Sequence, residues 1–186
     1  MVVEDFKVSI ESLEQGSVYR IEGEVTLDSV ELEFGSCTLL KPLKVEIEYL
    51  LRGRELFVQG KVKTVLSCPC SRCLESARVD INGEIEAIYR PIEKLKMLKR
   101  EEALEKLENV VYYSDPVVDL FERVIEAVVV EVPQKPLCKP DCKGLCPFCG
   151  ENLNEHPEHH CELLDEFLEE ARSNLLKGLQ LSLIHI

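Results

Sequence analysis

Tryptophan is missing from the 186-residue sequence, methionine occurs twice, and aromatic residues amount to only 6%. No apolar run approaches the roughly 18 residues that a membrane-spanning helix needs, so no membrane partner is expected. The N-terminus has neither the basic region nor the apolar run of a secretory signal peptide. We therefore expect a cytoplasmic protein, in which the nine cysteines serve better as metal ligands or reactive thiols than as a disulfide framework.

Motifs of catalysis are missing too. The sequence contains no nucleophile elbow, no phosphate-cradling glycine loop and no H-E-x-x-H helix. The neighbouring carboxylates Glu169 and Glu170 fit a solvated helix face better than an acid–base pair. The sequence therefore predicts a protein that is not an enzyme and takes no small-molecule substrate.

Charge is unevenly distributed along the chain, whose net charge of -13 argues against nonspecific coating of nucleic acid. Residues 41–78 carry eight Lys or Arg and four Glu, whereas residues 151–170 carry eight acidic residues and no Lys or Arg. These stretches are either ordinary solvated faces or surfaces for a partner that is part RNA and part basic protein. Candidate contacts to RNA or a partner are Arg52, Arg54, Lys61, Lys63 and Arg72.

Apolar and polar residues alternate in four stretches, which predicts four strands. They are residues 18–27, 43–50, 56–66 and 77–89. The R-G-R-E sequence between the second and third stretches is typical of a hairpin turn, and Gly60 suggests a bulge or a bend. Four successive strands with short links predict an antiparallel meander or half-open barrel with one face left to cover.

Helical periodicity elsewhere in the sequence predicts helices that cover this face, so the expected fold is α+β. Apolar residues fall on one stripe within residues 91–109, and a second helix is expected from Pro116 to about Val130. The sequence Ser-Asp-Pro before it resembles an N-terminal cap with proline at the first helical position. A last amphipathic helix is expected over residues 163–179.

The stretch 136–162 holds five of the nine cysteines and three of the four histidines. Its cysteines are spaced so that two side chains can point from one tight turn toward one ion. Thiolate and imidazole ligands favour zinc over magnesium or calcium. The predicted organisation is a sheet with covering helices (residues 1–135), a zinc-binding segment packed on it (136–162), and a C-terminal helix and tail (163–186).

A second cluster, C-P-C-S-R-C, occupies residues 68–73. Its Cys70 and Cys73 could meet Cys138 and Cys142, which the end of the long helix delivers. Closing a loop of about 65 residues costs roughly 4 kcal/mol. Structural zinc binding supplies on the order of 10 kcal/mol or more, so the closure is feasible before the sheet packs.

Two motifs carry a family resemblance. S-R-C-L-E at residues 71–75 follows a predicted strand, and residues 132–154 read V-P-Q-K-P-L-C-K-P-D-C-K-G-L-C-P-F-C-G-E-N-L-N. The chain resembles the YceD family of large ribosomal RNA subunit accumulation proteins over residues 5–165. In that family the second motif is followed by C-x-C. This chain has His159-His160-Cys161 there, so a histidine would replace the first cysteine.

The resemblance implies two zinc sites. Cys70, Cys73, Cys138 and Cys142 would form the first, and Cys146, Cys149, His159 and Cys161 the second. Two other partitions stay open: a zinc ribbon that pairs Cys70 and Cys73 with Cys146 and Cys149, or a single site within residues 138–161, so the cofactor is one or two zinc ions.

The remaining candidates are assigned more ordinary roles. Cys37 and Cys68 depart from the family pattern and are expected to be small buried or half-buried hydrophobic side chains rather than ligands. His156 and His160 are expected to be exposed, and Arg72 either contacts a phosphate, donates to a backbone carbonyl or pairs with Glu75.

The resemblance implies a non-enzymatic zinc-binding factor in ribosome biogenesis that supports accumulation or processing of large-subunit ribosomal RNA. Its partners would be ribosomal RNA, a ribosomal protein or an assembly factor. The alternative is a zinc module that binds a protein, for example a basic ribosomal protein, without contacting RNA. A thiol–disulfide oxidoreductase at Cys70 and Cys73 would need a helix N-terminus to lower a thiol pKa, and none is predicted there. A zinc hydrolase would need an open coordination position.

Overall fold

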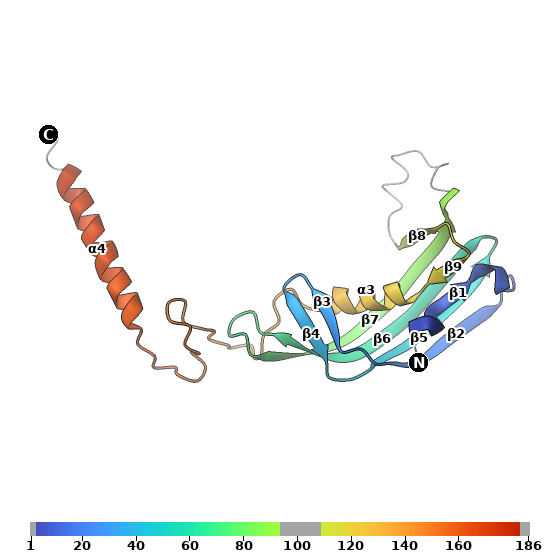
Figure 1. Ribbon diagram of the computed structural model, residues 1–186, viewed down its shortest axis with the longest axis horizontal. Coiled ribbons are helices and arrows are strands. Elements are labelled where there is room, and N and C mark those ends of the chain that lie inside the picture. Colours follow the sequence, from blue (N-terminus) through green and yellow to red (C-terminus); the bar gives the residue numbers. More distant parts are fainter. Residues whose placement is uncertain (1–2, 94–108, 183–186) are drawn as a thin grey trace. The chain divides into compact units, whose positions relative to one another are not determined.

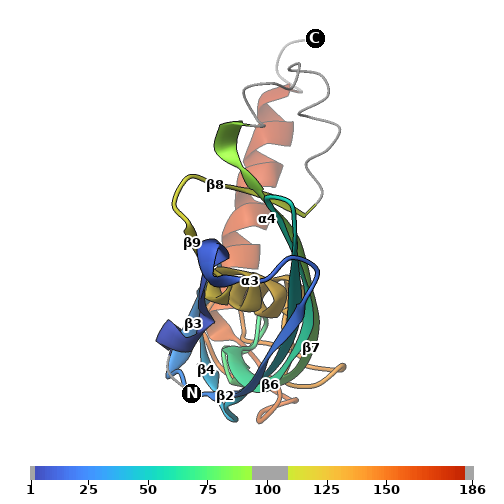
Figure 2. The ribbon, with the colours of Figure 1, turned by 90° about the vertical axis from the view of Figure 1, so that its right-hand side faces the viewer.

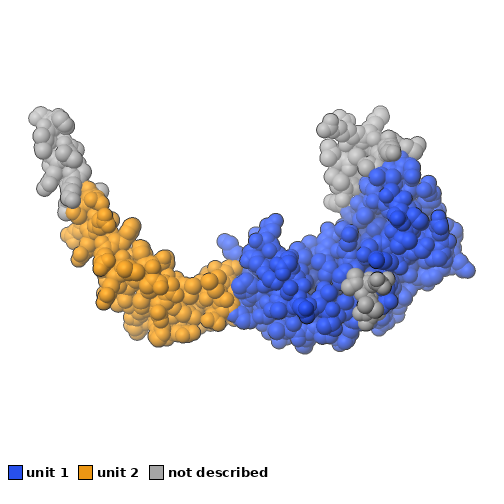
Figure 3. Space-filling view, viewed as in Figure 1, with its two compact units in different colours: residues 1–69, 76–136 blue, residues 70–75, 137–186 orange. Residues whose placement is uncertain are grey.

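The computed structural model describes residues 3–93 and 109–182, which divide into two compact units (Figure 3). Unit 1 comprises Met1–Pro69 and Ser76–Pro136, and unit 2 comprises Cys70–Glu75 and Leu137–Ile186. Most of the helix predicted over residues 91–109 lies outside the described residues. Every candidate metal ligand of the sequence belongs to unit 2.

An antiparallel meander forms the centre of unit 1 and confirms the predicted α+β fold (Figure 1). Its strands are β2 (Val18–Val25), β5 (Leu43–Arg52), β6 (Glu55–Pro69) and β7 (Ser76–Pro91). They pair in the order β2-β5-β6-β7, and they correspond to the four stretches of alternating sequence. The turn between β5 and β6 contains Gly53 at φ 61°, the left-handed conformation that glycine adopts without strain.

Five shorter strands were missed because each has only three to five residues. β3 (Ser29–Leu32) and β4 (Gly35–Leu39) form a hairpin whose second strand pairs with β6. β8 (Val110–Tyr113) pairs in parallel with β7. β1 (Lys7–Ser9) and β9 (Val117–Asp119) form a separate two-stranded sheet, and the short 3-10 helices η1 (Val3–Phe6) and η2 (Ile10–Ser12) flank β1.

The helix predicted from Pro116 begins later, at Phe121, as α3 (Phe121–Glu131). The prediction was wrong at this end because residues 117–119 are extended and pair with β1, a partner more than one hundred residues away in the sequence. Asp119, and not the expected Ser-Asp-Pro cap, makes the side-chain hydrogen bond at the start of this helix. Its Oδ1 accepts a hydrogen bond from the Phe121 backbone N–H at 2.8 Å.

Helix α3 lies in the concave side of the curved sheet, as Figure 2 shows. Its Val124 and Val128 are fully buried in the core. Helix α3 lies so close to strand β7 that the facing position must be glycine, because a Cβ at Gly83 would lie 2.6 Å from the backbone oxygen of Ala127. Gly60 has a similar role beside β5, where a Cβ would lie 2.4 Å from the oxygen of Glu46. The register runs through Gly60 without interruption, so no bulge forms there.

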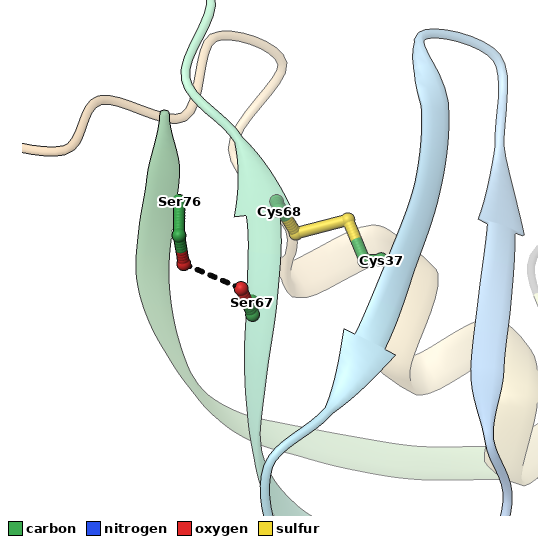
Figure 4. Close-up of a disulfide and its surroundings, with 4 residues drawn as sticks. All are labelled: Cys37, Ser67, Cys68 and Ser76. Carbon is green, nitrogen blue, oxygen red and sulfur yellow. Dashed lines mark hydrogen bonds between the residues drawn. A yellow bond between two sulfur atoms is a disulfide. The ribbon is translucent and has the colours of Figure 1, made fainter. Parts of the chain in front are cut away.

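A disulfide joins Cys37 of β4 to Cys68 of β6 (Figure 4). Both side chains are buried, as expected, but the expectation that the cysteines serve better as metal ligands or reactive thiols than in disulfides is wrong for this pair. Pairing of Thr38 with Ser67 brings the two cysteines opposite one another on adjacent strands. On the other edge of β6, the hydroxyl groups of Ser67 and Ser76 lie 2.6 Å apart.

Candidate metal centres

The first candidate centre begins in the turn Cys70–Glu75. The Cys70 N–H donates to the Glu75 oxygen at 2.7 Å, and the Leu74 N–H donates to the Cys70 oxygen at 2.9 Å. These two bonds close a tight turn with Cys73 inside it. Cys70 and Cys73 are therefore held by short-range backbone hydrogen bonds, and both are buried.

The same centre is completed by Cys138 and Cys142. The sulfur atoms of Cys70 and Cys142 lie 3.8 Å apart, and those of Cys73 and Cys138 lie 3.5 Å apart. All four sulfur atoms lie within 4.8 Å of one another. We call these four residues the first group.

Arg72 ties the two halves of the first group together. Its Nη1 donates to the Cys142 oxygen at 2.7 Å, and its own backbone oxygen accepts the Leu145 N–H at 3.1 Å. Gly144 fits against this contact, since a Cβ there would lie 3.0 Å from the Arg72 oxygen. Of the roles open to Arg72 in the sequence, donation to a backbone carbonyl is the one that the structure shows.

Asn154 also contacts the first group, a role that the sequence did not indicate. Its Nδ2 lies 3.3 Å from the Cys142 sulfur, and its Oδ1 accepts the Lys143 N–H at 2.9 Å. Asn152 Oδ1 accepts the Asn154 N–H at 3.0 Å, the turn-stabilising role expected of asparagine. An amide donor directed at sulfur favours a thiolate, so Asn154 supports the charged form of a ligand.

The second candidate centre is built on the turn from Cys146 to Gly150. The Cys146 N–H donates to the Glu151 oxygen at 2.8 Å, and the Gly150 N–H donates to the Cys146 oxygen at 2.9 Å. Gly150 takes φ 78°, which permits this tight turn. The turn directs Cys146 and Cys149 to one side.

His159 and Cys161 complete the second centre. The Nε2 of His159 lies 3.2 Å from the sulfur of Cys149. The ligand atoms of Cys146, Cys149, His159 and Cys161 all lie within 4.8 Å of one another, and we call these residues the second group. Cys161 also starts helix α4 (Glu162–Ser182), because its backbone oxygen accepts the N–H of Leu164 at 3.0 Å.

The other two histidines of the segment face carboxylates instead. His156 Nε2 lies 3.2 Å from Glu151, and His160 Nδ1 lies 3.1 Å from Asp165. Their side chains are 59% and 80% exposed, as expected from the sequence. The structure thus brings His159, and neither neighbour, into the second group.

In each group hydrogen bonds lower the pKa of at least one thiol below its ordinary value. Burial alone would raise the pKa of Cys70, but backbone N–H donors, that of Arg72 foremost, outweigh it and lower the pKa to about 6. In the second group, a backbone hydrogen bond from Cys149 is the largest cause that lowers the pKa of Cys146 to about 6. Burial raises the pKa of Cys73 to about 12. A bound cation would favour the thiolate form of every cysteine in the two groups.

Both groups fit zinc by their donors and their spacing. Bonds of about 2.3 Å from a tetrahedral zinc ion place two ligand sulfurs about 3.8 Å apart. The 3.8 Å and 3.5 Å separations in the first group agree with this geometry. Each group offers four protein donors, which is a complete structural zinc shell.

Four of the basic residues proposed to contact RNA, namely Arg52, Arg54, Lys61 and Lys63, belong to a part of unit 1 with mixed charge. Lys61 of β6 stands opposite Glu46 of β5 and Glu84 of β7 in the sheet register. Arg54 lies 3.5 Å from Glu93. Lys63 stands opposite Lys44 of β5 and Asn82 of β7, so the sheet is more basic here than around Lys61. The local positive charge of residues 41–78 is therefore interrupted by acidic side chains from neighbouring strands.

The fold and the two groups define a class of α+β protein whose cysteine-rich C-terminal segment could hold metal ions. Comparison with known families identifies the particular one. A family model described as large ribosomal RNA subunit accumulation protein YceD matches residues 58–175, so the chain belongs to the YceD family and the resemblance is confirmed.

Two relatives show how far the similarity extends. An uncharacterized protein of Mycobacterium tuberculosis is 30% identical over 141 residues, covering 76% of this chain and 63% of that protein. A protein of Arabidopsis thaliana named large ribosomal RNA subunit accumulation protein YCED homolog 1, chloroplastic, is 24% identical, covering 61% of this chain and 42% of that protein. The chain thus spans less than two thirds of the length of these relatives. No solved structure matches it.

In the described part of the chain, no helix is both long and apolar enough to span a bilayer.

Proposed function

We propose that this chain is a non-enzymatic, zinc-binding factor of ribosome biogenesis that acts in the cytoplasm and supports the accumulation or processing of large-subunit ribosomal RNA. The observation that carries the proposal is the pair of closed four-donor groups in a chain of the YceD family. The first group would hold one zinc ion through Cys70, Cys73, Cys138 and Cys142. The second would hold another through Cys146, Cys149, His159 and Cys161.

Zinc in these groups acts as a scaffold. When bound, it supplies positive charge that keeps the thiols ionised, and it stabilises the fold by on the order of 10 kcal/mol. The surrounding residues orient the ligands, with Arg72 joining the turn Cys70–Glu75 to the loop around Cys142. Within the described side chains of unit 2, helix α4 adds little cohesion of its own, because all its side chains from Glu162 to Asn174 are exposed except that of Leu164, which is half-buried.

The donor sets argue against catalysis at these sites. A zinc hydrolase uses three protein ligands and keeps a fourth position for water, whereas each group here offers four. A thiol–disulfide oxidoreductase places its reactive cysteine at a helix N-terminus. Cys70 and Cys73 lie between strands β6 and β7 instead.

A second candidate function is a zinc module that binds a basic protein without touching RNA. The mixed charge around Lys61 favours this alternative, because a surface for RNA should present cations with few acidic neighbours. The acidic residues of 151–170 favour it as well.

Depletion and complementation test the proposal. We expect depletion to lower large-subunit ribosomal RNA or to accumulate its precursors, and the unaltered chain to restore the profile. Unchanged RNA levels and precursor profiles after depletion would contradict the role. In parallel, the purified chain should contain two zinc ions, and Cys70→Ser and Cys149→Ser should each contain one.

Charge reversal separates the two candidate functions. The variant combines Arg52→Glu, Arg54→Glu, Lys61→Glu and Lys63→Glu. Loss of association with RNA, while protein association persists, favours direct RNA contact. Association with RNA that is lost only together with protein association, or that the purified chain lacks altogether, favours the protein-binding module. The matched control reverses Arg20→Glu, an exposed cation on the edge strand β2 of the same sheet.

A further inference from the structure

Helix α4 carries an apolar stripe that stays largely exposed among the described side chains of its unit. Leu164, Phe167, Leu168 and Ala171 recur at helical spacing and share one face, and Leu163 adjoins Phe167 at i+4. Leu163, Phe167 and Leu168 remain 51%, 55% and 54% exposed. Three large apolar side chains in two turns form a concentrated patch of a kind that often marks an interaction site.

The second group extends this patch and fixes its position. Phe148, which lies between Cys146 and Cys149, packs against Phe167 with ring centroids 5.5 Å apart, and it is itself 39% exposed. Cys161 accepts the first backbone hydrogen bonds of α4, from Leu164 and Asp165. Three ligands of the second group therefore position the apolar surface: Cys146 and Cys149 flank the aromatic ring, and Cys161 starts the helix.

Acidic side chains predominate around the stripe. Residues 162–174 contain five acidic residues and one basic residue, Arg172. By helical geometry Asp165 and Arg172 border the stripe on one side and Glu170 borders it on the other. Glu162, Glu166 and Glu169 lie on the opposite face of the helix.

This charge pattern indicates which kind of partner would fit the surface. Nucleic acid would be repelled by the acidic face. A second copy of the same helix would also be disfavoured, because five acidic residues and one basic residue on each copy leave a net excess of like charge. Lysine and arginine on a partner would instead complement this acidic excess and speed association.

We propose that Phe148 and the first turns of α4 form a docking surface for a basic protein of the large ribosomal subunit, which receives the stripe in an apolar groove rimmed by lysine and arginine. The mode is that of an amphipathic helix laid in a groove. This inference rests on the proposed function, which places the chain beside the proteins and RNA of that subunit. Zinc in the second group holds the surface in shape.

Binding to purified components tests the docking surface. The zinc-loaded full chain is immobilised and offered individually purified large-subunit ribosomal proteins, a large-subunit ribosomal RNA transcript, and the chain itself. We expect at least one basic protein to bind, and Phe167→Asp to weaken that binding about tenfold or more, because it places a charge at the centre of an apolar contact. The control Val18→Asp changes an apolar side chain that is 64% exposed in unit 1, and it should bind as the parent does.

A second variant covers the case in which Phe167→Asp disturbs the fold. Glu170→Lys keeps the stripe but reverses charge at its border, and it should weaken binding and reduce its dependence on salt. Zinc content, measured for every variant, should stay at two ions per chain. The proposal is overturned if no ribosomal protein binds, if neither variant weakens binding, or if the stripe proves to mediate binding of the RNA or of a second copy.

Failure of this inference can be told apart from failure of the proposed function. If depletion alters ribosomal RNA and both zinc ions are present, but no ribosomal protein binds through the stripe, only the docking surface is lost. If depletion leaves ribosomal RNA unchanged, the proposed function falls whatever the binding assay reports.

Discussion

Cys70 and Cys142 place their sulfur atoms 3.8 Å apart across a sequence separation of 72 residues. Between them the chain forms β7, the short strands β8 and β9, and helix α3 of unit 1. The first group thus joins a six-residue turn to a segment that begins more than sixty residues later. An ion there would close a long loop, which is where a cross-link restricts the unfolded chain most.

Arg72 should act on metal retention. Replacing Arg72→Ala removes the hydrogen bond to the Cys142 oxygen, so we expect weaker zinc binding at the first group by about 10- to 100-fold. Competition with a chromogenic chelator measures this, with Arg78→Ala as control because its partner Asp80 is exposed. If Arg72 serves RNA contact alone, zinc affinity will not change.

Gly83 should tolerate no side chain. In Gly83→Ala the new Cβ would meet the backbone oxygen of Ala127 at 2.6 Å, and a helix backbone cannot yield as a flexible side chain can. We expect a loss of about 1–3 kcal/mol in the free energy of unfolding, as for other overpacked sites. Urea denaturation measures it, and Asn82→Ala, at an exposed neighbour on β7, should stay within about 0.5 kcal/mol. Equal stability of the two variants would show that α3 does not pack this closely.

The Cys37–Cys68 disulfide should stabilise unit 1 independently of metal. It closes a loop with a sequence separation of 31 residues, and the chain-entropy relation gives about 3–4 kcal/mol for that length. Cys37→Ala with Cys68→Ala should therefore unfold at lower denaturant concentration while keeping both zinc ions. Thiol counting on the unreduced, metal-free chain should find seven free cysteines. Nine reactive thiols would contradict the disulfide.

Tyr89 should make unit 1 sensitive to alkali. Burial raises the pKa of Tyr89 to about 12, and its hydroxyl donates to the Asp119 oxygen at 3.1 Å. The unfolded chain releases this proton near pH 10 and the folded chain only near pH 12, so this stabilising contribution is present below about pH 10 and is lost between these values. The free energy of unfolding should fall over that range, more steeply than in Tyr89→Phe. Parallel pH profiles for the two proteins would refute the assignment.

The alternation of apolar and polar residues was sufficient to predict the long strands. The strands β2, β5, β6 and β7 are long enough for alternation to identify them, and their short links leave few topologies other than a meander. β1 and β9 are three residues each and exist only because they pair with one another, so their sequences carry no strand signal. That pairing also moved the start of α3 to Phe121, since residues 117–119 were already used as a strand.

The types and spacing of the cysteines by themselves determined that this chain carries thiolate-rich groups suited to zinc. Only the tertiary structure decided which side chains meet: Cys70 and Cys73 with Cys138 and Cys142, His159 rather than its neighbours, and Cys37 with Cys68. The reason is physical. A tight turn brings two ligands together through local hydrogen bonds, whereas the choice of partner for that turn depends on how distant parts of the chain pack.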